Sequence, residues 1–319
     1  MRLGISAVVL AAFLAGCAAR SPQTVPARGS DRQAPAGTDA GAESLSTFMA
    51  KVRYLSTRPV KRAGETLEAR DAELAADLAS LGALPTADAH WRVAERYRQR
   101  GVLDMAYRHF NRALALDPRH APAYEGLARV WRDWRLPHLG VADAHRATYY
   151  APASASARNT YGTLMQALGR DRDAKLSYEL AAMLDPKAAY AFNNLCYLSF
   201  LSGRIDAAIE SCQTAVALDP TLAAARNNLG LAFAAAGRMD LARTQFLDAG
   251  DRAAGLYNTG LVYLAAGDPR QALAAFDAAS RERATFALAR ERATRIRAML
   301  RLPGARATER IDGAPGQHP

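Results

Sequence analysis

Apolar and small residues recur along this chain in paired runs, each with the spacing of a helix that buries one face. The pattern is clearest over residues 189–249, where the letters NNL at 193–195 return at 227–229 and GR at 203–204 returns at 237–238. The offset between the two copies is 34 residues. A fixed period of this length is typical of a stacked-repeat protein, in which neighbouring units bury one continuous core.

Each period predicts a hairpin of two helices. Two apolar-periodic segments of about a dozen residues are joined by a turn that contains glycine. The second segment ends at a proline, which has no backbone N–H to donate and therefore stops the helix. The stops are Pro118, Pro152, Pro186 and Pro220, each 34 residues after the last. After the fifth unit the linker shortens, because Gly260 follows Gly230 by only 30 residues.

These hairpins resemble the tetratricopeptide repeat, whose signature combines Leu-Gly, an aromatic residue, alanine, phenylalanine and proline. In the fifth unit the signature residues are Leu229-Gly230, Phe233, Ala242 and Phe246. The resemblance implies an all-α fold, a right-handed solenoid of about six helix hairpins over residues 87–302 that ends in a C-terminal capping helix. We expect N-terminal capping helices in residues 45–85, where amphipathic patterns lack the repeat signature.

The first residues predict export and lipid attachment. Arg2 is followed by an apolar run too short to span a bilayer, which is typical of a signal peptide and defines residues 1–17. Leu14-Ala15-Gly16-Cys17 resembles the bacterial lipobox, which implies a lipidated Cys17. Because Ala18 and not Asp follows, the resemblance also implies an outer-membrane location facing the periplasm. The alternative is an ordinary secretory signal with an incidental cysteine.

Two further segments have the composition of chains that do not fold. Residues 18–44 are rich in Pro, Gly, Ala, Ser and Thr, with almost no apolar side chains, so we expect a disordered tether there. We expect residues 303–319 to form a disordered tail.

Charge and motif content narrow the function. The net charge is +10, and an arginine-rich surface favours anionic partners, although a genome that prefers arginine codons gives the same composition. The sequence has no phosphate-binding loop, nucleophile elbow, dinucleotide motif or histidine pair at metal spacing. We therefore expect no enzyme activity, no cofactor, no metal site and no nucleic-acid partner. The internal histidines are interpreted as separate surface or cap residues: His90, His109, His120, His138 and His145.

Cys196 and Cys212 fall on the two predicted helices of one hairpin, in the slots that Gly230 and Phe246 occupy in the next. The periplasm would permit a disulfide between them. Two small, buried core residues would give the same pattern. The sequence leaves both interpretations open.

In tetratricopeptide proteins, one face of each first helix lines the inner wall of the superhelix. We expect this wall to bind a protein partner, because exposed apolar residues mark interaction sites and asparagines can hold a peptide backbone. The predicted partner-binding residues are Tyr190, Asn193, Tyr197, Phe200, Asn227, Leu231, Tyr257, Leu261, Leu264 and Asn159. In the first three units the same face is charged, with Arg98, Arg129 and Arg132. The alternative is a groove covered by the chain's own helix at 286–302.

The lipobox, the tether and the Asn-Asn-Leu-Gly units together resemble the TadD family of Tad (Flp) pilus assembly lipoproteins. The resemblance covers residues 87–302 and implies a protein-protein interaction scaffold that acts as pilotin or assembly factor for a pilus secretin. The implied partner is a secretin subunit or another pilus assembly component. The alternatives are a type IV pilus biogenesis lipoprotein of the PilF or PilW kind and a generic envelope scaffold for peptidoglycan enzymes.

Overall fold

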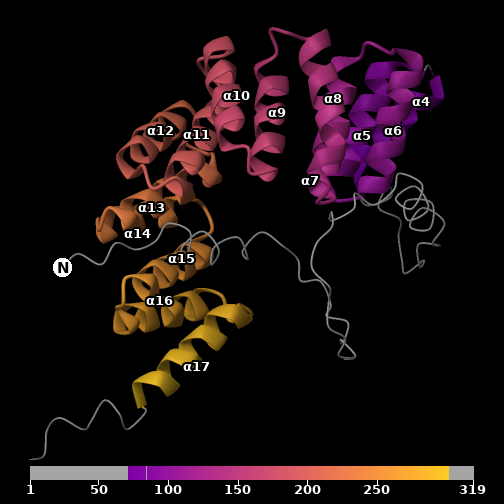
Figure 1. Ribbon diagram of the computed structural model, residues 1–319. Coiled ribbons are helices and arrows are strands. Elements are labelled where there is room, and N and C mark those ends of the chain that lie inside the picture. The colour runs from indigo at the N-terminus through magenta and orange to yellow at the C-terminus, as the bar shows by residue number, and fades with distance from the viewer. Residues whose placement is uncertain (1–70, 84, 302–319) are drawn as a thin grey trace, which may run out of the picture. The chain divides into compact units, whose positions relative to one another are not determined.

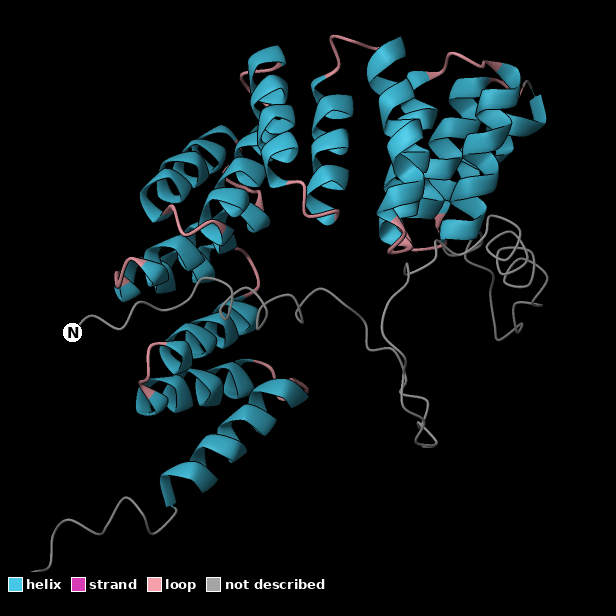
Figure 2. Ribbon diagram, viewed as in Figure 1, coloured by secondary structure: helices cyan, strands magenta, loops and turns pink. Residues whose placement is uncertain are grey.

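The computed structural model describes residues 71–83 and 85–301, and all regular structure within them is helical (Figure 2). The lipobox, the tether, the first part of the N-terminal cap and the C-terminal tail lie outside the described residues. The described residues fall into two compact units that divide between Gly169 and Arg170. We call them the N-terminal unit, up to residue 169, and the C-terminal unit, from residue 170. No helix in either unit has both the length and the apolar character needed to cross a bilayer.

The N-terminal unit consists of one capping helix, two helix hairpins and a further single helix (Figure 1). Its helices are α4 (Ala72–Ala83), α5 (Ala87–Gln99), α6 (Leu103–Leu116), α7 (Ala121–Asp133), α8 (Pro137–Tyr150) and α9 (Ala155–Ala167). Leu74 of α4 is fully buried in the same cluster as Tyr97 and Phe110 of the first hairpin. The helix before the first repeat therefore covers the apolar end of that repeat.

The C-terminal unit begins with a single helix, continues with three hairpins and ends in a capping helix (Figure 1). Its helices are α10 (Asp171–Leu184), α11 (Ala189–Leu201), α12 (Ile205–Leu218), α13 (Ala223–Ala235), α14 (Met239–Asp248), α15 (Arg252–Ala265), α16 (Pro269–Glu282) and α17 (Ala287–Arg301). In both units, each second helix with a predicted proline stop ends two residues before that proline. The predicted helix hairpins are confirmed within each unit.

The turn inside each hairpin places one residue in the left-handed backbone region. Gly101, Gly203 and Gly237 have φ angles of 75°, 72° and 75°. Arg135 takes the same place in the α7–α8 hairpin, with φ 66°. A side chain disfavours this conformation because its Cβ crowds the following carbonyl oxygen, whereas glycine adopts it freely. Arg135 is therefore a strained position in a turn that glycine fits.

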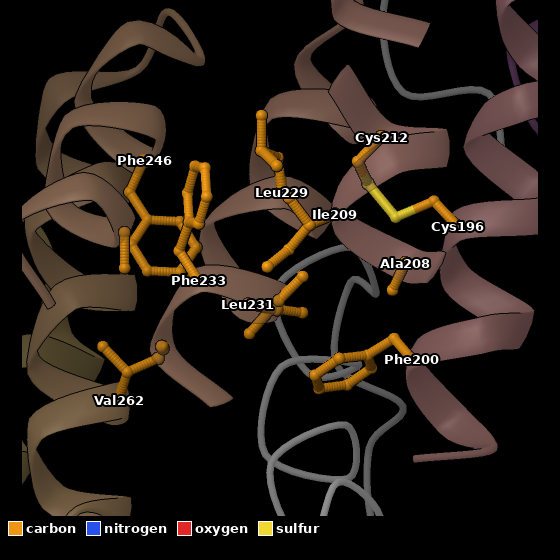
Figure 3. Close-up of a cluster of buried hydrophobic side chains, with 13 residues drawn as sticks. Cys196, Phe200, Ala208, Ile209, Cys212, Leu229, Leu231, Phe233, Phe246 and Val262 are labelled. Carbon is orange, nitrogen blue, oxygen red and sulfur yellow. A yellow bond between two sulfur atoms is a disulfide. The ribbon is translucent and has the colours of Figure 1, made fainter. Parts of the chain in front are cut away.

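The α11–α12 hairpin is closed by a disulfide between Cys196 and Cys212, whose Cα atoms are 5.1 Å apart (Figure 3). Both cysteines are also fully buried in the core cluster. At the corresponding positions of the next hairpin, a Cβ on Gly230 would come within 2.6 Å of the Phe246 ring. The disulfide therefore occupies the closest contact between the two helices, and both interpretations of the cysteines hold.

The shortened linker of the fifth unit is visible as a shorter second helix. α14 has 10 residues, whereas α12 has 14. The chain then approaches α15 closely, because a Cβ on Gly255 would lie 2.3 Å from the carbonyl oxygen of Phe246. Glycine is required at position 255 because backbone occupies the space that a side chain would need.

α17 covers the open end of the last hairpin. Ala289, Ala293 and Ile296 are buried against it, and the Phe286 ring lies 5.0 Å from the Tyr257 ring between centroids. Arg290, Arg295 and Arg297 of α17 are exposed, as expected for the solvated end of a repeat array. Part of the predicted groove is thus covered by the chain's own terminal segment, as the alternative interpretation expected.

Two histidines form a buried pair inside the first hairpin. The Nδ1 atoms of His90 and His109 lie 3.1 Å apart, and both side chains are buried. Burial, with the nearby charges of His90 and Arg112, lowers the pKa of His109 to about 4, and burial followed by Arg112 lowers that of His90. The interpretation of these two histidines as separate surface or cap residues was wrong. His120 does cap a helix, since it accepts a hydrogen bond from the Ala123 N–H.

Replacing Arg135 by glycine should stabilise the protein. The change removes a left-handed side-chain conformation that costs about 1–2 kcal/mol, offset in part by about 0.5–1 kcal/mol of added freedom in the unfolded chain. We expect a gain of about 0.5–1 kcal/mol in the free energy of unfolding, measured by urea denaturation. The converse change, Gly203→Ala, should destabilise by a similar amount. A loss of stability in Arg135→Gly would contradict this account of the turn.

Stability should fall in mild acid because of the His90–His109 pair. The folded-state pKa of His109 is lowered, so its contribution is complete above the unfolded pKa of about 6.5 and is lost as the pH falls toward 4. The full shift corresponds to at most about 3 kcal/mol. His109→Asn should flatten the pH dependence of the unfolding free energy between these limits, while His138→Asn, at an exposed position, should leave it unchanged. Parallel pH profiles for both variants would show that the pair does not titrate this way.

Candidate partner-binding surface

A ladder of asparagine side chains connects successive first helices of the C-terminal unit. Asn228 of α13 donates from Nδ2 to the Oδ1 of Asn193 on α11 at 2.9 Å. Asn258 of α15 donates from Nδ2 to the Oδ1 of Asn227 on α13 at 3.1 Å. Asn193 in turn donates to the Asn194 Oδ1 at 3.5 Å. We call Asn193, Asn194, Asn227, Asn228 and Asn258 the asparagine ladder.

The ladder holds polar groups in fixed positions along one face. Each asparagine amide has two N–H donors and a carbonyl oxygen with two lone pairs, and a rung uses one donor and one acceptor. Asn193 and Asn227 are half-buried, so their amides remain in reach of a partner. Asn258 is 9% exposed, and its Oδ1 has no hydrogen-bond partner among the described residues. Because it is buried, Asn258 orients the Asn227 side chain and does not itself contact a bound partner.

Two tyrosines accompany the ladder on α11. Tyr190 is 36% exposed and Tyr197 is half-buried. Their spacing from Asn193, three residues before and four after, places all three side chains on one helix face. Leu264 of α15 is half-buried at the edge of the last hairpin. The accessible part of the predicted surface is therefore aromatic and amide in character.

Four predicted groove residues are buried. Phe200 is 1% exposed and Leu231 is 4% exposed, and both belong to the core cluster that contains Ala208 and Ile209 (Figure 3). Tyr257 and Leu261 belong to the cluster beneath α17. These side chains do not present open surface, because apolar neighbours in the same cluster surround them. Their role in binding stays a prediction, but these four side chains are too buried to act as exposed anchors for a partner.

The N-terminal unit carries an ionic network on the first-helix face. Arg98 donates to Glu95 at 2.6 Å and to Asp133 at 3.1 Å. Arg132 also donates to Asp133 at 3.1 Å. Burial would raise the pKa of Glu95, but the hydrogen bond and charge of Arg98 outweigh it and hold that pKa below its usual range. The two arginines are thus compensated by carboxylates of their own unit.

Glu125 of α7 is the centre of the second half of this network. Ser156 and Thr160 of α9 donate to its Oε1 at 2.6 and 2.8 Å, and Arg129 also binds that carboxylate. Arg129 itself donates to the Ser156 hydroxyl at 2.9 Å. Asn159, which is also on α9, is half-buried. The face predicted as a charged end of the groove is therefore a set of internal ion pairs, which links helices more than it attracts a distant partner.

No group of three or more His, Cys, Asp or Glu side chains within residues 71–83 and 85–301 is arranged to hold an ion. The surface offers amides, phenol rings and paired charges, which are groups that bind through hydrogen bonds and packing.

Sequence comparison detects the repeat directly in one part of the chain. A family described as "TPR repeat" matches residues 197–237, which cover the end of α11 and all of α12 and α13. No curated protein matched the chain by sequence.

Solved structures match the fold over much more of the chain. PilW, a type IV pilus biogenesis factor, is 19% identical, with a TM-score of 0.56 over 66% of this chain and 97% of that one. PilF of Pseudomonas aeruginosa is 20% identical, with a TM-score of 0.53 over 67% and 97%. A chain of the APC/C hetero-tetramer Cut9-Hcn1 is 18% identical, with a TM-score of 0.60 over 79% of this chain. The match covers only 49% of that longer chain.

At sequence identities of 18–20%, the structural matches are evidence for the fold alone. Together with the repeat detected at 197–237, they agree with the hairpins, proline stops and close helix contacts described above. The described part of the chain is therefore an all-helical array of hairpins with a fold similar to that of tetratricopeptide proteins, and the repeat itself is identified by sequence at residues 197–237.

Proposed function

We propose that this protein is a periplasmic interaction scaffold, anchored to the outer membrane by lipid, that holds a partner protein on its asparagine ladder. The observation that carries the proposal is the ladder itself, a row of hydrogen-bonded amides across α11, α13 and α15. An extended peptide needs a donor and an acceptor at regular intervals along its backbone. Amides fixed on successive helices provide such groups, and Tyr190 and Tyr197 add aromatic packing beside them.

The proposed outer-membrane location rests on the lipobox, and the buried disulfide supports a periplasmic environment. Leu14-Ala15-Gly16-Cys17 has the residues that lipoprotein processing requires, and the following segment at 18–44 is long enough to separate the repeats from a membrane surface. Disulfides persist in oxidising compartments such as the periplasm, and the Cys196–Cys212 bond fits that environment.

The partner is a component of a pilus assembly machine, with a secretin subunit of a Tad (Flp) system as our first choice. The fold matches cover 97% of the PilF chain and 97% of the PilW chain. PilW is a type IV pilus biogenesis factor, so a fold of this kind is used in that process. The TadD-like combination of lipobox, tether and repeats favours the Tad system. A PilF-like or PilW-like role is the second candidate, and a scaffold for peptidoglycan enzymes is the third.

The anchor can be tested at Cys17. Cys17→Ser removes the thiol that would carry the lipid, so we expect the variant to lose labelling by radioactive palmitate and to leave the outer-membrane fraction. Cys196→Ser with Cys212→Ser serves as the control, since these buried cysteines should not affect labelling. Palmitate labelling that survives in Cys17→Ser would exclude the lipoprotein assignment.

The binding surface can be tested at the two tyrosines. Truncating Tyr190 and Tyr197 together to alanine should weaken capture of the secretin by about 2 kcal/mol or more, because aromatic anchors dominate interface energetics. Tyr149→Ala, at an exposed tyrosine of the N-terminal unit, is the matched control. The measurement is pull-down of the secretin from solubilised envelopes, with thermal melts to confirm folding. Equal capture by the double variant and the parent, at equal melting temperature, would place the partner elsewhere.

A further inference from the structure

The last two helices of the N-terminal unit, α8 and α9, line a pocket of about 390 Å³. Volumes of roughly 300–1,000 Å³ are typical of the sites that hold small molecules in proteins. The lining residues come from the end of α8, the turn after it and the first half of α9, and they are His145, Thr148, Tyr149, Pro152, Arg158 and Tyr161. Arg158 is the permanent charge of this set, and none of the six is a carboxylate.

Arg158 has no partner for its guanidinium within the chain. The residue is half-buried, and its side chain forms no hydrogen bond or ion pair with the described residues. A guanidinium carries five N–H donors and no acceptor. Donors that are partly removed from water without an acceptor cost free energy, so these groups need an acceptor that comes from outside the protein.

The corresponding positions of other repeats do have an internal acceptor. One period earlier, the Tyr124 hydroxyl donates to the carbonyl oxygen of the proline six residues before it, at 3.2 Å. Two periods later, Arg226 donates from Nε to the carbonyl oxygen of the proline six residues before it, at 2.8 Å. Pro152 is the equivalent proline for Arg158 and lines the pocket, but the described residues show no such bond there. Arg158 therefore departs from the arrangement that its repeat position favours.

The carboxylates around the pocket are already paired. α8, α9 and the turn between them contain one carboxylate, Asp143, which pairs with Arg146 at 3.5 Å. α7 packs against both helices and contributes Glu125 and Asp133, each of which is bound by an arginine of the same unit. The charge of Arg158 is therefore not compensated by the helices that form the pocket, which favours an anion in this place.

Tyr161 adds a second donor and an apolar wall. It is half-buried, and its hydroxyl forms no hydrogen bond with the described residues. A phenol can donate its O–H to an anion, while its ring packs against an apolar group. The Thr148 hydroxyl is not available as a donor, because it donates to the carbonyl oxygen of His145 at 2.9 Å. The pocket thus combines a cation, a phenol donor and a ring face.

We propose that this pocket binds a small organic anion, whose carboxylate or phosphate group pairs with Arg158 and whose ring lies against Tyr161. The planar fork of arginine matches the geometry of both anionic groups, so the two share one recognition chemistry. The inference does not depend on the proposed partner, because the pocket belongs to the N-terminal unit and the asparagine ladder belongs to the C-terminal unit.

The first test compares anions and a cation of similar shape. Benzoate, phenyl phosphate and benzylamine are each titrated into the full chain, with binding followed by ligand-observed NMR. At least one of the two anions should bind, and benzylamine should not. The tighter of the two identifies the group as a carboxylate or a phosphate. No binding of either anion up to about 10 mM, or equal binding of benzylamine, would overturn the proposal.

Variants then place the bound anion. Arg158→Gln should weaken the tighter anion by about tenfold or more, because it removes charged hydrogen bonds. Arg119→Gln, at an exposed arginine of the same unit, is the matched control and should retain the parent affinity. Tyr161→Phe keeps the ring but removes the hydroxyl, so it should weaken binding less than Arg158→Gln does. Thermal melts check folding. Parent affinity in Arg158→Gln, or an equal loss in Arg119→Gln, would overturn the assignment to this pocket.

Discussion

The close approach of the two helices in each hairpin is the constraint on which the rest of this structure depends. A large side chain on the second helix can lie against the first only where the first has almost no side chain. The Phe246 ring lies so near Gly230, and the Phe276 ring so near Gly260, that an added Cβ would come within 2.6 and 2.7 Å of them. At this distance any larger residue would force the ring or the helix to shift and would disturb the core that the next hairpin covers.

The α11–α12 hairpin meets the same constraint by a covalent route. Cys196 replaces the small residue and Cys212 replaces the ring, and the bond between them spans the gap that phenylalanine fills elsewhere. A disulfide also restricts the unfolded chain, which stabilises a closed loop of this size by about 3 kcal/mol on the loop-entropy estimate. One end of the disulfide, Cys196, is on α11, the helix that carries Tyr190, Asn193 and Tyr197. The proposed binding residues are therefore held by the most constrained hairpin of the C-terminal unit.

Features that repeat with the period could be predicted from the sequence, whereas pairings between unlike residues could not. Pro220 and Gly230 recur at fixed intervals, and each has a backbone reason for its place, so the helix ends and close contacts followed from them. Contacts such as Glu125 to Thr160 join positions 35 residues apart with no shared signature. Only an alignment of neighbouring first helices, one period apart, would have suggested that pairing.

The histidine pair could not be predicted from the sequence, and the asparagine ladder could be predicted only in part. His90 and His109 are 19 residues apart on different helices, and no spacing rule for a single helix brings them together. Asn193 and Asn227 were recognised as surface candidates because the period repeats them, but their rungs to Asn228 and Asn258 required the stacking of helices to be known. Burial of Phe200 was missed for the same reason, since its neighbours come from α12 and α13 as well as from its own helix.

Stacked repeats separate functions because the first and second helices present different residues to solvent. In the C-terminal unit, the ladder and its tyrosines belong to α11, α13 and α15, whereas the exposed apolar residues Leu176, Leu180 and Met183 belong to α10. A mutation at one of these three exposed residues removes no side chain of the ladder, because the ladder hydrogen bonds join asparagines of α11, α13 and α15 only. The surfaces of first and second helices can therefore vary independently on one fold, because the glycine and alanine positions that hold the hairpins together lie between the helices and not on either surface.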